Sequence, residues 1–240
     1  MRSAGACTDT VRGAVVMLDS RGLVFAGRDH LDPDKEPFAL PAAALAGYGL
    51  GPASPSSRYD LETVVRQVAP TILIGTSGTP GAFTEQAIRQ MAARSKAPIV
   101  FPLSNPTSKS EATPQDVLRW SDGRALVATG SPFGPVDVGG AARLVGQANN
   151  VFTFPGVGLG VIVSRASEVT NGMFLAAATM LAGLVPDERL TAGALYPPLA
   201  GLRSVSRAIA IAVAEEARGS GVARMPAGQD VAAAVDSAMW

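Results

Sequence analysis

The sequence predicts an α/β protein built on a parallel β-sheet with helices on both faces. Three short apolar runs, residues 71–74, 98–103 and 125–129, have the length and composition of buried strands. Segments with helical periodicity lie between these runs. Parallel strands need long crossover connections and bury both faces, so this alternation favours a doubly wound parallel sheet.

A fourth apolar run, residues 15–18, comes directly before Asp19 and the turn sequence Asp-Ser-Arg-Gly. We expect a buried parallel strand with the acid at its tip. The residues that follow, to about Ser57, are rich in Pro, Gly and Ala and show little periodicity. This stretch predicts a long irregular segment that holds short helices at most and contributes little to the core.

Helix starts are marked by capping residues. Asp60 precedes a helix that ends before Pro70 and whose apolar positions recur at helical spacing: Leu61, Val64, Val65 and Val68. Thr113, with a proline next and Asp116 three residues on, predicts a second start. Between them a further helix has an apolar inner face made of Ala87, Ile88, Met91 and Ala92. From residue 167 onward the pattern is helical.

Composition excludes several classes of protein. The chain has 240 residues, 47% of them hydrophobic, so it can bury a sizeable core. Twenty basic residues balance twenty acidic ones, so no net field attracts nucleic acid or an anionic membrane. The single cysteine, Cys7, excludes an internal disulfide. The longest apolar run, residues 173–185, is shorter than the ~20 residues of a spanning helix. We expect a soluble, cytoplasmic protein.

In an open parallel sheet, ligands bind beyond the carboxyl ends of the strands, and polar residues gather at those positions here. Asp19 lies where a dinucleotide-binding fold places the carboxylate that accepts hydrogen bonds from the adenosine ribose. A solvated turn aspartate explains it equally well. Arg21 and Lys35 follow the acid, an arrangement that can favour NADP through its 2′-phosphate. A solvated surface charge is the alternative for Lys35.

Residues 75–81, Gly-Thr-Ser-Gly-Thr-Pro-Gly, allow close backbone approach and lead into a helix, which suits a phosphate or the sugar edge of a cofactor. A plain tight turn is the alternative. A hydrolase nucleophile at Ser77 is disfavoured, because the one histidine, His30, lies in the irregular segment and is expected on the surface. The glycine clusters at residues 47–51 and 156–160 lack the spacing and preceding strand of a dinucleotide fingerprint.

Amide side chains also lie beside expected strand ends. They occur in residues 104–107, Ser-Asn-Pro-Thr, and in residues 146–150, Gly-Gln-Ala-Asn-Asn. An asparagine can donate to and accept from a carboxamide or a carboxylate at once, although asparagine is also common in ordinary turns. No Cys/His cluster and no carboxylate pair at ligand spacing occurs, so the sequence predicts no complete metal site.

Five sequence motifs, in order along the chain, resemble motifs of the malic enzyme family. They are Ile-Gly-Thr-Ser-Gly-Thr-Pro-Gly-Ala-Phe, Phe-Pro-Leu-Ser-Asn-Pro-Thr-Ser-Lys, Ala-Thr-Gly-Ser-Pro-Phe, Gly-Gln-Ala-Asn-Asn-Val-Phe-Thr-Phe-Pro-Gly-Val-Gly-Leu-Gly and Leu-Tyr-Pro-Pro-Leu. The resemblance, which runs from about Val15 to the C-terminus, implies oxidative decarboxylation of L-malate to pyruvate and carbon dioxide. NAD or NADP would take the hydride, and Mg²⁺ or Mn²⁺ would act in the intact enzyme.

The resemblance also implies roles for individual residues. Asp19, with Ser20 and Arg21, corresponds to the ribose-side acid and its turn. The loop after the second run corresponds to a cofactor-lining turn, with Gly75, Ser77, Gly78 and Gly81. The amide words correspond to groups near the nicotinamide and malate, with Ser104, Asn105 and Asn149 on the cofactor and Asn105 and Asn150 on the substrate. The family's tyrosine acid, lysine base and carboxylate metal ligands have no counterpart in this chain.

These resemblances imply three regions. Residues 1–14 would be an atypical N-terminal leader, residues 15–165 a partial Rossmann-like domain for NAD(P) that lacks its first βαβ unit, and residues 166–240 C-terminal helices packed on the same domain. Both ends suggest a truncated chain. The first hypothesis is the cofactor-binding portion of a malic enzyme, inactive alone and part of a homo-oligomer when intact. The alternative is a stand-alone nucleotide-binding or subunit-interaction module without catalysis.

Overall fold

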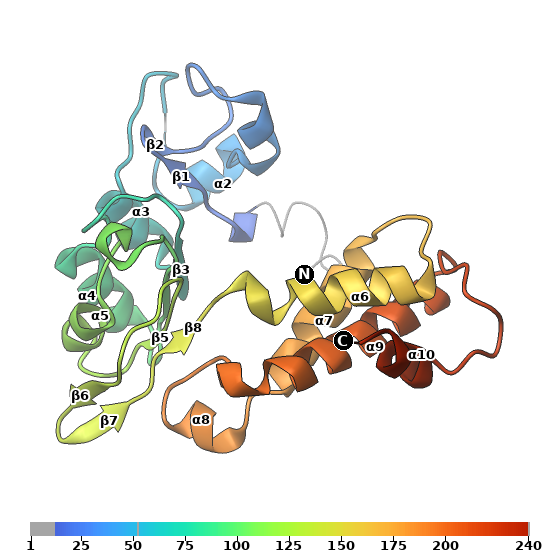
Figure 1. Cartoon of the computed structure of the whole chain (residues 1–240). Coiled ribbons are helices and arrows are strands. Elements are labelled where there is room, and N and C mark those ends of the chain that lie inside the picture. The colour runs from blue at the N-terminus through green and yellow to red at the C-terminus, as the bar shows by residue number, and fades with distance from the viewer. Residues whose placement is uncertain (1–12, 52, 240) are drawn as a thin grey trace. The chain divides into compact units, whose positions relative to one another are not determined.

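The computed structural model describes residues 13–51 and 53–239, and the chain divides into two compact units (Figure 1). Unit 1 is Met1–Ala125 and unit 2 is Leu126–Trp240. Most of the expected N-terminal leader, residues 1–12, lies outside the described residues.

Unit 1 opens with an antiparallel hairpin. Strand β1 (Leu18–Asp19) pairs with β2 (Gly22–Leu23), with Asp19 opposite Gly22. The prediction of a buried parallel strand over residues 15–18 was therefore wrong, and Val15 is 48% exposed. The physical reason is the Asp-Ser-Arg-Gly turn, in which Gly22 adopts a φ of 98° and returns the chain at once to pair with its own preceding strand.

The segment that follows is irregular, as predicted, with a 3-10 helix η2 (Pro33–Phe38) and a short helix α2 (Ala42–Gly47). His30 is exposed, also as expected. The prediction that this stretch contributes little to the core was wrong. Three of its leucines, Leu40, Leu45 and Leu50, are buried and form a hydrophobic cluster with residues in and near β2 and α3 (Leu61–Val68): Leu23, Phe25 and Val64. The leucines recur every five residues, a spacing that belongs to neither a helix nor a strand.

The rest of unit 1 alternates strands and helices. Strands β3 (Ile72–Gly75) and β4 (Ile99–Pro102) are parallel, in register from Ile72 opposite Ile99 to Gly75 opposite Pro102. Helix α4 (Glu85–Arg94) packs against both α3 and α5 (Pro114–Trp120), and a 3-10 turn η3 (Thr107–Lys109) follows β4 (Figure 1). The strands and the parallel pairing are confirmed.

Side-chain caps fix where these helices begin. Asp60 accepts a hydrogen bond from Thr63 N, and Thr113 accepts one from Asp116 N, as predicted for both starts. The predicted inner face of α4 is buried in full: Ala87, Ile88, Met91 and Ala92. One expectation was wrong, because Ile72 and Ile74 of β3 are 50% and 58% exposed.

Unit 2 begins with two further strand pairs. Strand β5 (Leu126–Thr129), the predicted fourth strand, is parallel to β8 (Gly146–Gln147), with Thr129 opposite Gln147. Between them, β6 (Val136–Val138) and β7 (Ala141–Arg143) form an antiparallel hairpin. The hairpin turns through Gly139 and Gly140, both at positive φ.

Helices make up the remainder of unit 2: η4 (Asn150–Phe152), α6 (Phe154–Ser164), α7 (Asn171–Gly183), α8 (Asp187–Thr191), η5 (Leu199–Gly201), α9 (Leu202–Gly219) and α10 (Val231–Ala238). Helices α6, α7 and α10 all pack on α9, which is the centre of this unit (Figure 1). The helical prediction from residue 167 is confirmed. No helix of the described residues is long and apolar enough to cross a membrane.

Helix α6 was not predicted, because it runs through the glycine cluster at residues 156–160. A Cβ atom on Gly156 would lie 2.7 Å from Ile209 Cβ and 2.8 Å from Ser206 O. On Gly160 it would lie 2.7 Å from Ala210 O. These two glycines therefore let the backbone of α6 approach α9 closely. The glycines of this cluster thus serve helix packing, which fits their lack of the spacing found in phosphate-binding loops.

A matched pair of substitutions tests this packing. Gly156→Ala should lower the free energy of unfolding by about 1–3 kcal/mol, because the backbone oxygen of Ser206 cannot give way. Gly158→Ala, on the same helix, meets nothing within 4 Å and should raise it by about 0.5–1 kcal/mol. Denaturant titration of each variant measures both effects, and equal responses from the two positions would contradict this account.

Candidate functional site

The loops that follow β3 and β4 are joined in unit 1. Leu103 N donates to Gly75 O at 2.9 Å, and Gly78 N donates to Ser104 Oγ at 2.8 Å. The carboxyl ends of two parallel strands thus present a single structured edge, as the predicted topology requires. It contains the predicted site residues of this part of the chain: Gly75, Ser77, Gly78, Gly81, Ser104 and Asn105.

A buried carboxylate that the sequence analysis missed lies beneath this edge. Glu111 is 0% exposed. Its Oε1 accepts hydrogen bonds from Ser77 N at 2.7 Å, from Ser77 Oγ at 2.9 Å and from the Ser104 hydroxyl. Its Oε2 accepts from Ser104 N at 3.3 Å. No spacing or periodicity marks Glu111, since it stands alone in a loop, so no sequence signal could have singled it out.

The charge state of Glu111 follows from two opposing effects. Burial raises its pKa, while hydrogen bonds from Ser104, from its own backbone N–H and from Ser77 lower it. The hydrogen bonds outweigh the burial, so the pKa lies below its ordinary value. Glu111 is therefore ionised at neutral pH and acts only as an acceptor.

The glycines of this loop have two different roles. A Cβ atom on Gly75 would lie 2.6 Å from both Glu111 Cδ and Phe83 Cζ, so the close approach predicted at this glycine is made by a protein side chain. Gly78 and Gly81 adopt positive φ, and a Cβ atom on either would meet nothing within 4 Å. They leave an open backbone surface, which fits close approach of a cofactor.

Asn105 is exposed at the end of β4, and its peptide bond to Pro106 is cis. The neighbouring Ser104 is buried between the two loops. Of the two predicted residues, Ser104 is therefore part of the buried framework that joins the loops, and Asn105 is on the surface.

In unit 2 the two predicted asparagines follow β8 directly. Asn149 Oδ1 accepts from Val151 N at 3.0 Å and caps η4, and both Asn149 and Asn150 are exposed. Gln147 Nε2 donates to Gly130 O at 3.1 Å, which ties this segment to the residues after β5. Both asparagines are thus exposed residues just after the carboxyl end of a parallel strand, and their binding roles stay predictions.

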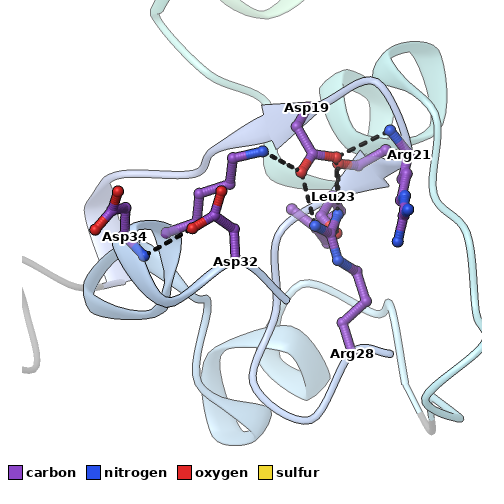
Figure 2. Close-up of polar contacts among 8 residues, drawn as sticks. Asp19, Arg21, Leu23, Arg28, Asp32 and Asp34 are labelled. Carbon is purple, nitrogen blue, oxygen red and sulfur yellow. Dashed lines mark hydrogen bonds and ion pairs between the residues drawn. The ribbon is translucent and has the colours of Figure 1, made fainter. Parts of the chain in front are cut away.

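Asp19 is bound by two cationic side chains of unit 1, Arg28 and Lys35 (Figure 2). Arg28 makes a two-pronged contact, 3.0 Å to Oδ1 and 2.7 Å to Oδ2, and Lys35 Nζ lies 2.9 Å from Oδ2. Arg21 N adds a backbone bond of 2.9 Å to Oδ1. The hydrogen bond from Arg28 is the largest of the effects that hold the pKa of Asp19 well below its ordinary range, against the opposing effect of burial.

Both carboxylate oxygens of Asp19 are therefore occupied by protein donors. Arg28 is buried and also donates to the carbonyls of Gly22 and Leu23, so the ion pair fixes the β1–β2 hairpin. Ser20 and Arg21 are exposed at the tip of the turn. A ribose at Asp19 would have to replace or share these bonds, and the ribose-side role of this turn stays a prediction.

No cluster of three or more metal-ligating side chains occurs in the part of the chain that the structure describes. The described residues do not fit a catalytic metal, so no chemical step through one is assigned to them.

The fold and these loops define the class: a Rossmann-like α/β domain with polar loops at the carboxyl ends of parallel strands. The family model described as "Malic enzyme, NAD binding domain" matches residues 1–218. The chain belongs to the malic enzyme NAD-binding domain family.

Relatives and solved structures agree with this assignment. The chain is 43% identical over its whole length to the NAD-dependent malic enzyme of Sodalis glossinidius, of which it covers 42%. It is 43% identical over 223 residues, 93% of the chain, to NAD-dependent malic enzyme 3 of Bacillus subtilis, of which it covers 39%. The chain thus spans about two-fifths of the length of these relatives. The similarity begins at residue 1, so the expectation that it starts near Val15 was wrong.

Two solved malic enzymes have the same fold. The enzyme of Entamoeba histolytica matches 93% of this chain with a TM-score of 0.68 and 25% identity, and the chain covers 40% of it. The enzyme of Pyrococcus horikoshii matches 92% of this chain with a TM-score of 0.66 and 24% identity, and the chain covers 45% of it. The predicted Rossmann-like α/β fold is confirmed.

The Asp19 ion pair can be tested through stability. Asp19→Asn should lower the free energy of unfolding at pH 7 by about 3 kcal/mol, because it leaves the buried Arg28 without its partner. The pKa of Asp19 is lowered by folding, so this contribution is fully present above the ordinary value of 3.8 and is lost as the pH falls below it. Urea denaturation at several pH values should show the difference between variant and wild type shrinking only in acid.

The control is Asp236→Asn, which removes an exposed ion pair with Arg207. Solvent screens that pair, so no resolvable change in stability is expected. Equal effects of the two substitutions would show that Asp19 is no more than a surface charge.

Proposed function

We propose that the chain is the NAD-binding portion of a malic enzyme that oxidatively decarboxylates L-malate to pyruvate and carbon dioxide. The observation that carries this proposal is the joined edge of the loops after β3 and β4 in a chain of this family. The relatives' names, NAD-dependent malic enzyme, support both the reaction and the cofactor.

The loops after β3 and β4 leave backbone and polar side chains exposed that a dinucleotide could contact. In unit 1 the backbone around Gly78 and Gly81 and the side chains of Ser77 and Asn105 would contact the cofactor. In unit 2, taken by itself, Asn149 is the residue that the family resemblance assigns to the cofactor; it is exposed, and its amide can donate. NAD, when bound, supplies the hydride acceptor for oxidation of malate.

Cofactor preference is proposed to be NAD over NADP. A 2′-phosphate is usually matched by a free cation near the ribose-side acid. Of the two candidates for that contact, Lys35 lies 2.9 Å from Asp19 and is paired with it, while Arg21 is exposed and bonds Asp19 through its backbone N. If Lys35 were to bind the 2′-phosphate of NADP, its ion pair with Asp19 would have to break. NAD has no 2′-phosphate and can bind with this pair intact.

For malate, the family resemblance points to Asn105 in unit 1 and to Asn150 in unit 2; each residue is exposed after a strand of its own unit, and an asparagine amide can donate to a carboxylate. The acid, base and metal ligands of the family have no counterpart in this sequence. We therefore propose that the chain binds cofactor without completing turnover, and that Mg²⁺ or Mn²⁺ acts only in the longer enzyme.

Calorimetric titration of the purified chain with NAD and with NADP, followed by an absorbance assay for NADH with malate and Mn²⁺, tests the proposal. Binding of NAD in preference to NADP, with no malate-dependent NADH, is the expected result. Affinity should be weak, because the glycine fingerprint that holds the pyrophosphate has no counterpart here. Malate-dependent turnover would overturn the assignment of missing catalytic groups, and absence of any dinucleotide binding would favour an interaction module.

A further inference from the structure

Three consecutive backbone amides of the loop after β3 are directed toward one carboxylate oxygen. Ser77 N donates to Glu111 Oε1 directly at 2.7 Å. Gly78 N donates at 2.8 Å to the Ser104 hydroxyl, and Thr79 N donates at 3.2 Å to the Ser77 hydroxyl. Both of these hydroxyls donate in turn to Glu111 Oε1.

The charge of Glu111 sets the direction of this network. A serine hydroxyl has a single proton, and an ionised carboxylate can only accept. Ser77 and Ser104 must therefore give their protons to Glu111, and their lone pairs are left to accept the N–H groups of Thr79 and Gly78. A neutral side chain at position 111 would leave both hydroxyls able to turn.

Glu111 is itself held in place on two sides. Its carbonyl oxygen accepts from Phe83 N at 3.1 Å, just before α4 begins. Its side chain fills the space that the missing Cβ of Gly75 leaves open. Since Glu111 is 0% exposed, water does not compete for its bonds.

We infer that Glu111 is a positioning residue of the proposed NAD site, an inference that rests on the proposed function. By turning three N–H groups inward, it fixes the shape of the glycine loop. The same arrangement removes the free amides that a phosphate site requires, so the loop takes a hydroxyl-bearing sugar portion of NAD.

Amide hydrogen exchange and NAD titration on the full chain test the inference with a matched pair of variants. Ser104→Ala removes the hydroxyl between Glu111 and Gly78. Ser121→Ala removes another buried hydroxyl of unit 1, which also donates one hydrogen bond, here to the carbonyl Leu118 O, and accepts one from an amide, Ala125 N. The control therefore measures the general cost of losing a buried serine hydroxyl.

Ser104→Ala should accelerate exchange at Gly78 at least about fivefold and raise the Kd for NAD by a similar factor. Ser121→Ala should lower the thermal midpoint comparably and leave both quantities unchanged. Ser77, which is exposed and can accept an extra methyl group, gives a rescue test. Ser77→Ala should accelerate exchange at Thr79, while Ser77→Thr keeps the hydroxyl and should restore slow exchange.

Unchanged exchange at Gly78 in Ser104→Ala would overturn the inference, as would faster exchange with an unaltered Kd for NAD. Inorganic phosphate that protects the three amides in the wild-type chain would overturn the sugar-side assignment. If the wild-type chain fails to bind NAD, the proposed function fails, and the exchange data still decide whether Glu111 organises the loop.

Discussion

The buried carboxylate of Glu111 is the constraint on which the candidate site in unit 1 depends. A charge without solvent contact is tolerated only when hydrogen bonds replace its water, and here the donors all come from the two loops that edge the strands. Satisfying the charge therefore joins the loops. Gly75 is required because any side chain there would occupy the carboxylate's position.

Different interactions order the polar loops of the two units. In unit 1, the β1–β2 hairpin is fixed by the Asp19–Arg28 pair and the glycine loop by Glu111, so buried charge organises both. In unit 2, close packing of small residues between α6 and α9 anchors the helix that follows the asparagine segment. The polar groups of each unit stay exposed because the ordering interactions lie beneath them.

Sequence patterns predicted the elements whose order is local. Caps at Asp60 and Thr113, the inner face of α4 and strands β3, β4 and β5 could be inferred because capping and periodicity act within a few residues. The motifs that resemble the malic enzyme family located the candidate site loops. Long-range features could not be inferred: the burial of Leu40 and the role of Glu111 depend on partners up to 34 residues away.

The loops after β3 and β4 of unit 1 are proposed to bind the cofactor above the buried framework of Glu111. A two-dimensional ¹⁵N NMR titration of the chain with NAD tests this proposal most directly. Shifts should be largest for residues 76–81 and Asn105, with small changes at Ala87 and Ile88 in the core of the same unit. Shifts confined to other surfaces, or spread through the buried core, would contradict the account.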